Sequence, residues 1–135
     1  MKRAIILVLV FMCAIGLTAC GGKVMWARIT ECSSEIYTDE EIRQAINEAV
    51  RYFKREFAGC TLLEIGYAGD DKQAGFRDLA ERRGADEVIV LISAFTVDGS
   101  GRCQGLNPNS TYKGWNWILM RDKGGPWKHM DHGYG

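Results

Sequence analysis

The sequence predicts an α+β domain in which a long N-terminal helix packs on a curved, cone-like antiparallel sheet. Three observations lead to this fold class. Residues 38–58 place apolar side chains at three- and four-residue steps, which is the spacing of one helical face. Four later stretches are rich in β-branched and aromatic residues, and glycine-containing segments separate them, as is typical of strands. The last three of these strands follow one another without an intervening helix, which indicates antiparallel pairing around the long helix.

The N-terminus carries an export signal. Lys2 and Arg3 precede residues 4–14, which are apolar without interruption. This run is too short to cross a bilayer as a helix, which takes about 20 residues, but it has the order of a secretory signal peptide. It closes on Leu17-Thr18-Ala19-Cys20, which resembles the lipobox of bacterial lipoproteins. The resemblance implies cleavage after Ala19 and a diacylglyceryl group, with acyl chains such as palmitate, on the sulfur of Cys20.

The chain therefore divides into a lipoprotein signal peptide (residues 1–19), a lipid-anchored tether (20–35) and one α+β domain (36–135). Two acyl chains hold a protein stably on a membrane, so we expect a location on the extracytoplasmic face of the cell membrane. Lys2 and Arg3 leave with the signal, so 15 of the 17 Lys and Arg remain against 17 Asp and Glu. A net charge near −2 argues against a nucleic-acid partner.

The tether contains a segment, residues 23–30, that is too apolar to remain solvated. It has two possible places. It docks on the domain as an edge strand, or it lies at the membrane interface with Trp26 between Lys23 and Arg28. We favour docking.

The long helix has the clearest signals. Thr38 and Glu41 have the spacing of a capping box, and acidic residues follow the cap at the positive end of the helix dipole. Tyr37 before the cap can pack against Ile42, and Gly59 ends the helix. The predicted core face contains Ile42, Ala45, Ile46, Ala49, Val50, Phe53 and Phe57.

After a strand at residues 61–67, a shorter helix is expected to be capped by Asp70 or Asp71 and to run through Arg83. Gly75 weakens the helical pattern, and Gly84 is expected to end the helix. Residues 87–97 contain a β-branched run that is typical of a central strand covered on both faces.

A glycine-rich loop at residues 98–110 then leads to a strand at 111–122. Its alternation places Trp115, Trp117 and Leu119 on one face. The last strand is expected at residues 127–131, with Pro126 at an edge position.

Two resemblances concern the whole domain. The closing hairpin, residues 117–128, is similar to the last hairpin of the nuclear-transport-factor-two-like and cystatin-like folds, where a glycine turn precedes a Trp-Lys pair. Several stretches resemble an uncharacterised lipoprotein family of Gram-positive gut bacteria, a domain of unknown function. This resemblance implies a fold and a location but no activity, and it is carried by residues 34–38, 57–62, 85–87, 106–112 and 131–135.

Three cysteines follow the lipobox, at positions 32, 60 and 103. An odd number allows at most one disulfide. Cys32 and Cys60 flank the long helix, which makes their pairing awkward, whereas Cys103 could pair with either. Three free thiols are equally compatible with the sequence.

The residues that could carry acid–base chemistry are His129, Asp131 and His132. A neutral histidine is a good general base, and a carboxylate can orient it. Strand alternation predicts that His129 and Asp131 share a face and that His132 points to the other. Zinc held by His129, His132 and Cys103 would match no known ligand spacing, so we expect no metal and no cofactor.

Aromatic residues crowd the last two strands, where they either fill the core or line a pocket: Tyr112, Trp115, Trp117 and Trp127. The sequence therefore favours a binding module for a small molecule or a protein, with these four residues as candidates for the ligand site. The alternative is a small pocket enzyme, isomerase-like or hydratase-like, that uses His129 or His132 with Asp131.

Overall fold

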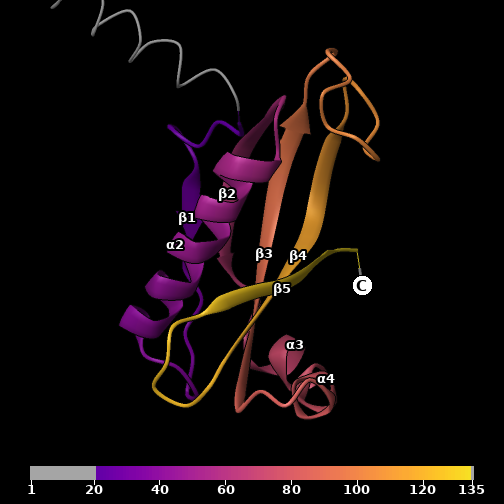
Figure 1. Cartoon of the computed structure of the whole chain (residues 1–135). Helices are drawn as coiled ribbons and strands as arrows, with labels where there is room; N and C mark the ends of the chain where they lie inside the picture. Colours follow the sequence, from indigo (N-terminus) through magenta and orange to yellow (C-terminus); the bar gives the residue numbers. More distant parts are fainter. Residues whose placement is uncertain (1–20, 135) are drawn as a thin grey trace, which may run out of the picture.

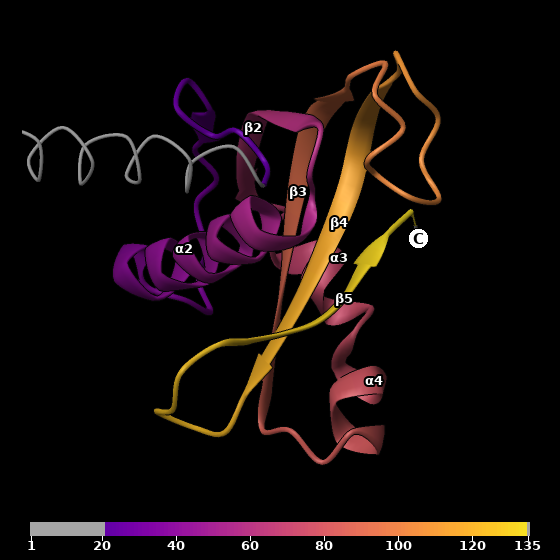
Figure 2. The same cartoon turned by 45° about the horizontal axis from the view of Figure 1, so that its top comes forward.

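The structure is a computed structural model that describes residues 21–134, so the signal peptide and Cys20 lie outside the described residues. The described chain forms one open five-stranded sheet in the order β1-β2-β3-β4-β5. Helix α2 covers one face of the sheet, and two short helices, α3 and α4, lie at one end of the opposite face (Figures 1 and 2). The predicted fold class, α+β with a long helix packed on a sheet, is confirmed, but the sheet is open and mixed where a curved, cone-like antiparallel sheet was expected.

Helix α2 (Asp39–Glu56) begins as its sequence predicts. The Thr38 hydroxyl accepts from the Glu41 N–H at 3.2 Å, and the Glu41 carboxylate accepts from the Thr38 N–H at 2.8 Å. This reciprocal pair satisfies two N–H groups of the first turn that have no partner within the helix. The helix buries Ile42, Ala45, Ile46, Ala49 and Phe53 against the sheet, which are five of the predicted core positions.

Four strands pair in antiparallel fashion in chain order: β2 (Cys60–Tyr67), β3 (Glu87–Val97), β4 (Thr111–Arg121) and β5 (Lys128–Gly133). The sheet is nevertheless mixed, because β1 (Arg28–Thr30) pairs with β2 in parallel. The close approach of β1 depends on Gly66. A Cβ there would lie 1.9 Å from the Thr30 hydroxyl oxygen, so a larger residue would push the edge strand away.

The segment before and including β1, residues 21–30, lies on the domain, and we call it the N-terminal strap. The Gly22 N–H donates to the Lys54 carbonyl at 3.1 Å, and Lys23 exchanges two backbone bonds of 2.9 and 2.8 Å with Cys60 and Leu62. The expected docking of residues 23–30 on the domain is thus confirmed, with β1 as the edge strand.

The second helix differs from its prediction. It is two short helices, α3 (Asp70–Ala74) and α4 (Arg77–Arg82), because the chain breaks its helical path at Gly75 and Phe76. The expected cap by Asp70 or Asp71 was wrong, since Gly69 occupies the cap position without a side-chain bond.

Asp70 instead ties three segments together. Its carboxylate accepts from the Ser34 hydroxyl at 2.6 Å, from the Tyr67 hydroxyl at 2.7 Å and from the Glu35 N–H at 2.8 Å. These bonds lower the pKa of Asp70, the bond from Ser34 most strongly. Hydrogen bonds to an ionised carboxylate are stronger than those between neutral groups, so Asp70 holds the segment before α2 against the end of β2.

The two faces of β4 follow the predicted alternation. Trp115, Trp117 and Leu119 lie in the main core under α2, whereas Ile118 and Met120 pack with Val88 and Ala80 beneath α4. The end of β4 that follows the 98–110 loop therefore carries aromatic side chains toward α2, and this end holds the candidate site.

Candidate functional site

A bulge in β5 decides where its polar side chains point. The register pairs Leu119 with His129 but Ile118 with Asp131, so Met130 has no partner across the strands. One extra residue reverses the in-and-out alternation. His129 and His132 consequently lie on the helix-covered face, and Asp131 lies on the other. The predicted sharing of a face by His129 and Asp131 was wrong for this reason.

The two histidines contact each other. His129 Nε2 lies 2.9 Å from His132 Nδ1, and the Tyr52 ring stacks on His129 with ring centres 3.8 Å apart. Burial, followed by the proximity of His132, lowers the pKa of His129 to about 4, and burial also lowers the pKa of His132. Both rings are therefore neutral near pH 7, and one ring nitrogen donates to the other.

Asp131 takes no part in this pair. Its side chain is exposed, and its Oδ1 accepts only from the N–H of His132 at 2.8 Å among the side-chain bonds described. The predicted acid–imidazole set of an isomerase-like or hydratase-like enzyme is thus not assembled at one place, because the carboxylate is on the face away from the two imidazoles.

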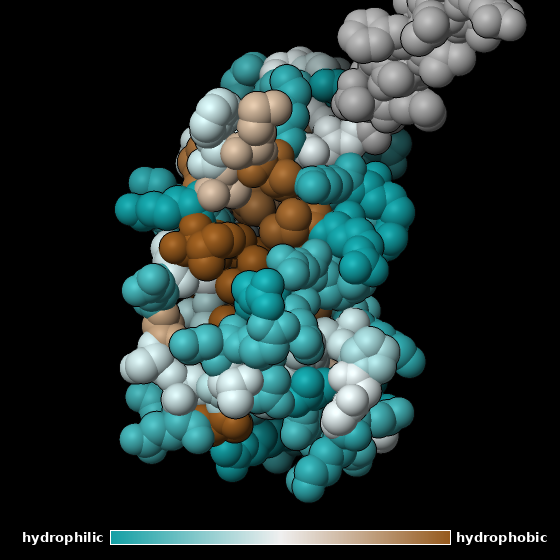
Figure 3. Space-filling view, turned by 90° about the vertical axis from the view of Figure 1, so that its left-hand side faces the viewer, coloured by the Kyte–Doolittle hydropathy of each residue, from teal (hydrophilic) through white to brown (hydrophobic). Residues whose placement is uncertain are grey.

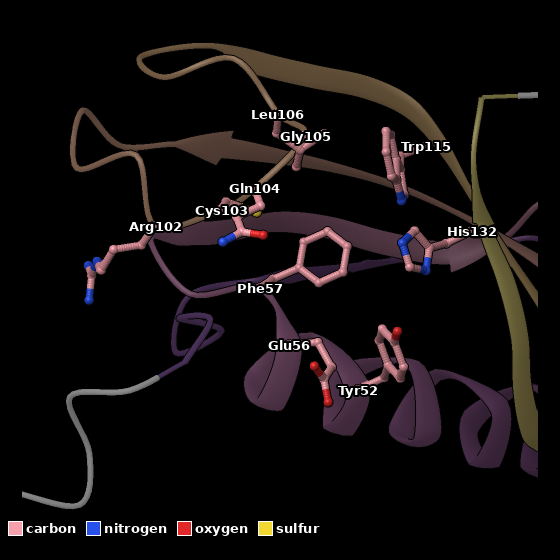
Figure 4. A pocket seen from close by; sticks show the side chains of 10 residues that line it. All are labelled: Tyr52, Glu56, Phe57, Arg102, Cys103, Gln104, Gly105, Leu106, Trp115 and His132. Atoms are coloured by element: carbon pink, nitrogen blue, oxygen red, sulfur yellow. The ribbon is translucent and has the colours of Figure 1, made fainter.

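A pocket of about 370 Å³ opens beside His132, between the last turn of α2, the 98–110 loop, β4 and β5 (Figure 4). Its lining combines aromatic rings with a few polar groups. The lining residues are Tyr52, Glu56, Phe57, Arg102, Cys103, Gln104, Gly105, Leu106, Trp115 and His132.

Of the four aromatic residues that the sequence marks, only Trp115 lines this pocket. It is 8% exposed, and its Nε1 is buried without a hydrogen-bond partner within residues 21–134. In Figure 4 the ring nitrogen lies at the edge of the indole nearest His132, whose ring centre is 5.8 Å from that of Trp115.

The other two tryptophans belong to the core. Trp117 is fully buried and donates to the Ser93 hydroxyl at 2.8 Å, and Trp127 donates to the Glu41 carbonyl at 3.1 Å. Both N–H groups are satisfied within the domain, as buried indoles usually are.

Tyr112 holds the loop instead of lining the pocket. Its ring stacks on Phe95 with ring centres 5.3 Å apart, and its hydroxyl accepts from the Asn107 N–H at 3.0 Å. It therefore fixes the loop that supplies half of the pocket wall.

Sequence reasoning missed Tyr52, Glu56 and the loop residues as site residues. Tyr52 belongs to a helical pattern that a core face and a solvated face already explain, and Glu56 follows on its solvated side. Apolar residues in the loop have no regular spacing, so the sequence does not show which of its side chains pack against the domain. The glycines at its turns, Gly101 and Gly105, have positive φ values of 72° and 82° and were the available signal for a loop of defined shape.

The cysteines are three free thiols in the described chain: Cys32 exposed, Cys60 buried and Cys103 intermediate. Burial, followed by a hydrogen bond in which the Cys60 thiol donates to Cys103, raises the pKa of Cys60 to about 12. Cys103 shares the pocket wall with His132, yet no group of three His, Cys, Asp or Glu side chains within residues 21–134 is placed to hold a metal ion. The zinc combination considered from the sequence is thus not assembled there.

A second cavity, a groove of about 730 Å³, lies between the N-terminal strap and α2. Ile29, Ile42 and Ile46 supply its apolar wall. Figure 3 looks at the side of the molecule where β1 and α2 lie and shows apolar side chains gathered on its upper part.

Comparison with known proteins gives no relative from which a role could be transferred. No protein-family model, curated protein or solved structure matches the chain. In the part of the chain that the structure describes, no helix combines the length and the apolar character needed to cross a bilayer.

Proposed function

We propose that this protein is a lipoprotein, held on the extracytoplasmic face of a bacterial membrane by acyl chains on Cys20, and that its domain binds a small ligand in the pocket beside His132. The anchor is supported by the Leu17-Thr18-Ala19-Cys20 tetrad directly after an apolar signal run. The family resemblance of residues 34–38 and 106–112 points to the same location.

The observation that carries the ligand site is the unpaired N–H of Trp115. A buried donor without a partner costs about 1–3 kcal/mol, so native domains seldom keep one without a reason. A ligand with a hydrogen-bond acceptor would satisfy this donor after a shift of the indole or of the neighbouring His132 ring, because the nitrogen itself is buried. The pocket volume of about 370 Å³ lies at the small end of ligand sites.

The rest of the lining indicates the chemistry of the ligand. Tyr52, Phe57 and Trp115 provide aromatic surface for a flat apolar group, and the neutral His132 can donate or accept one bond. The charge of Arg102 is already engaged, since it bonds to Asp98 at 3.2 Å and to Ser100 at 3.1 Å. In Figure 4 its guanidinium points away from the pocket. We therefore favour a small neutral molecule with a planar apolar part and an acceptor.

The ligand site can be tested through the indole N–H signals of the four tryptophans. The chain from Gly21 onward, labelled with ¹⁵N, is titrated with cell-wall fragments, short peptides and small metabolites, and the Trp115 signal is assigned from Trp115→Phe. A binder should shift the Trp115 signal and leave that of Trp127, whose N–H is bonded within the domain. If no compound of these classes moves the Trp115 signal, the ligand site is overturned.

The anchor can be tested by feeding cells a clickable palmitate analogue. Cys20→Ser should abolish labelling of the protein, whereas Cys32→Ser, which changes an exposed cysteine of the domain, should keep it. Equal labelling of the Cys20→Ser and parent chains would contradict the anchor.

A further inference from the structure

The N-terminal strap carries exposed apolar side chains at its tip. Met25 is 81% exposed and Trp26 is 89% exposed, and Ile29 beyond them is 53% exposed. The other three tryptophans of the chain are at most 8% exposed, so Trp26 is set apart from them by its position.

This exposure belongs to a fixed turn. Met25 and Trp26 are the two corner residues of a turn that the Ala27 N–H closes by donating to the Val24 carbonyl at 3.1 Å. Lys23 before the turn is bonded to Cys60 and Leu62, and β1 after it is paired with β2. The domain therefore holds the two side chains outward on a rigid base.

Folding offers no reason for apolar residues at these corners. Glycine, asparagine, aspartate, serine and proline are the residues that turns favour, since they suit turn geometry and solvent. Two adjacent large apolar side chains held outward at a fixed turn, with Ile29 exposed beyond them, are typical of a contact site for a partner or a membrane.

The neighbouring charges are basic. Lys23 and Arg28 flank the tip in sequence, and Gly21 and Gly22 pack against the last turn of α2, which contains Lys54 and Arg55. Arg28 is paired with Glu64 at 2.5 Å and Arg55 with Glu56 at 2.9 Å, whereas Lys23 and Lys54 have no ion-pair partner within residues 21–134. Basic residues around a Trp are attracted to anionic headgroups at a membrane interface.

The expected anchor is close to this tip. Trp26 is the sixth residue after Cys20, and a fully extended chain covers at most about 3.6 Å per residue, so the backbone of the tip lies within about 22 Å of the backbone of the modified cysteine. Because Gly22 and Lys23 are bonded to the domain, little of that length is slack.

We propose that the tip formed by Met25 and Trp26 inserts into the interfacial layer of the membrane that holds the acyl chains, so that the strap side of the domain faces the lipid. This inference rests on the proposed anchor at Cys20. The partner surface is a bilayer with anionic headgroups, since tryptophan favours the headgroup level and the adjoining lysines favour negative charge.

The experiment uses the full lipidated protein, purified with its lipid and reconstituted in vesicles of phosphatidylcholine and phosphatidylglycerol. Some vesicles contain phosphatidylcholine brominated on its acyl chains, which quenches nearby tryptophans. Since Trp26 is one of four tryptophans and the only one far exposed, brominated lipid should remove up to about a quarter of the emission. Trp26→Phe should abolish this quenching. Acrylamide, a water-soluble quencher, should quench Trp26 less in the vesicle-bound protein than in the lipid-free chain from Gly21, measured in solution without detergent.

The outcomes separate the inference from the anchor. Protein that sediments with the vesicles while Trp26 escapes brominated lipid and stays open to acrylamide keeps the anchor and overturns the inserted tip. Shielding from acrylamide without quenching by brominated lipid means that a second copy covers Trp26, and this also overturns it. Protein without attached lipid overturns both proposals.

Discussion

Arg121 on β4 donates to the Glu41 carboxylate on α2 at 2.5 Å, although 80 residues separate them. The same guanidinium donates to Glu87 at 2.5 Å, and it lies 4.1 Å from the ring centre of Trp127. Its side chain is 6% exposed. Glu41 also closes the capping box, so one arginine connects the start of α2 with β3 and β4.

Replacing this arginine should destabilise the fold. In Arg121→Met, Glu41 and Glu87 lose their shared cation while they remain partly buried, and charged groups left without a partner are costly. We expect the free energy of unfolding to fall by about 2–4 kcal/mol in urea titrations. Arg43→Met removes an exposed i,i+3 ion pair with Glu40. This control should change the free energy of unfolding by less than about 0.5 kcal/mol. Equal effects of the two substitutions would refute the role of Arg121.

Stability should depend on pH in a window that belongs to the histidine pair. The pKa of His129 falls from 6.5 to about 4 in the fold, so between these values the unfolded chain binds the proton more readily than the folded one. Stability from the neutral pair is complete above pH 6.5 and is lost as the pH falls toward 4. Each pKa unit is worth about 1.4 kcal/mol, and partial exposure reduces the sum to about 1–2 kcal/mol.

The chain contains two histidines, and the carboxyls whose pKa the fold lowers, such as Glu41 through its bond from the Thr38 backbone, change stability only at lower pH. Urea titrations at several pH values between 6.5 and about 5.5 therefore isolate the pair. The double variant His129→Gln, His132→Gln should show a flat profile there. A slope that survives in this variant would have another origin.

Two tryptophan substitutions should separate ligand binding from stability. Trp115→Phe removes a buried N–H that has no partner within residues 21–134, so we expect a change in stability within about 1 kcal/mol. Trp127→Phe loses the bond to Glu41 and part of the contact with Arg121, and should cost about 1–2 kcal/mol more. For any ligand found, Trp115→Phe should weaken binding about tenfold, equivalent to about 1.4 kcal/mol, and Trp127→Phe should not. Calorimetry measures the affinity for the ligand, and urea titration measures the free energy of unfolding. If Trp115→Phe weakened binding by much less than tenfold, the Trp115 N–H would not be the donor to the ligand.

Gly66→Ala should release the edge strand. An added Cβ would meet the Thr30 hydroxyl at 1.9 Å and the Thr30 carbonyl at 2.4 Å, so β1 would have to move away. We expect faster hydrogen exchange of Leu62 and of the strap amides, with slower exchange preserved in β3 and β4. Gly75→Ala is the matched control, since its Cβ would make an ordinary contact of 3.5 Å and its φ of −67° suits alanine. Unchanged exchange in Gly66→Ala would show that β1 tolerates the extra carbon.

The sequence predicted those features that local patterns determine. Thr38 and Glu41 marked the start of α2 because a capping box is contained in four residues. Residues 87–97 marked β3 because a central strand consists of apolar side chains throughout. Asp70 was misread because its local role as a cap competes with Ser34 and Tyr67, and only the folded chain brings Ser34 near. The β5 bulge at Met130 has no local signal, so the sequence could not show that His129 and His132 would meet. The pocket could not be predicted because an irregular loop forms half of its wall. Neither the spacing of apolar residues nor a helix-capping motif determines how such a loop packs.

The parallel pairing of β1 and β2 bears on the order in which the newly made protein matures. A chain is synthesised from its N-terminus, so the strap is completed before the strand that must receive it. Parallel neighbours cannot join through a tight hairpin, and here the whole of α2 has to form and cross the sheet first. During early folding the apolar strap is therefore unpaired, because β2 has not yet formed. Until β2 is available, the unpaired backbone of the strap is open to proteases and to strands from other chains.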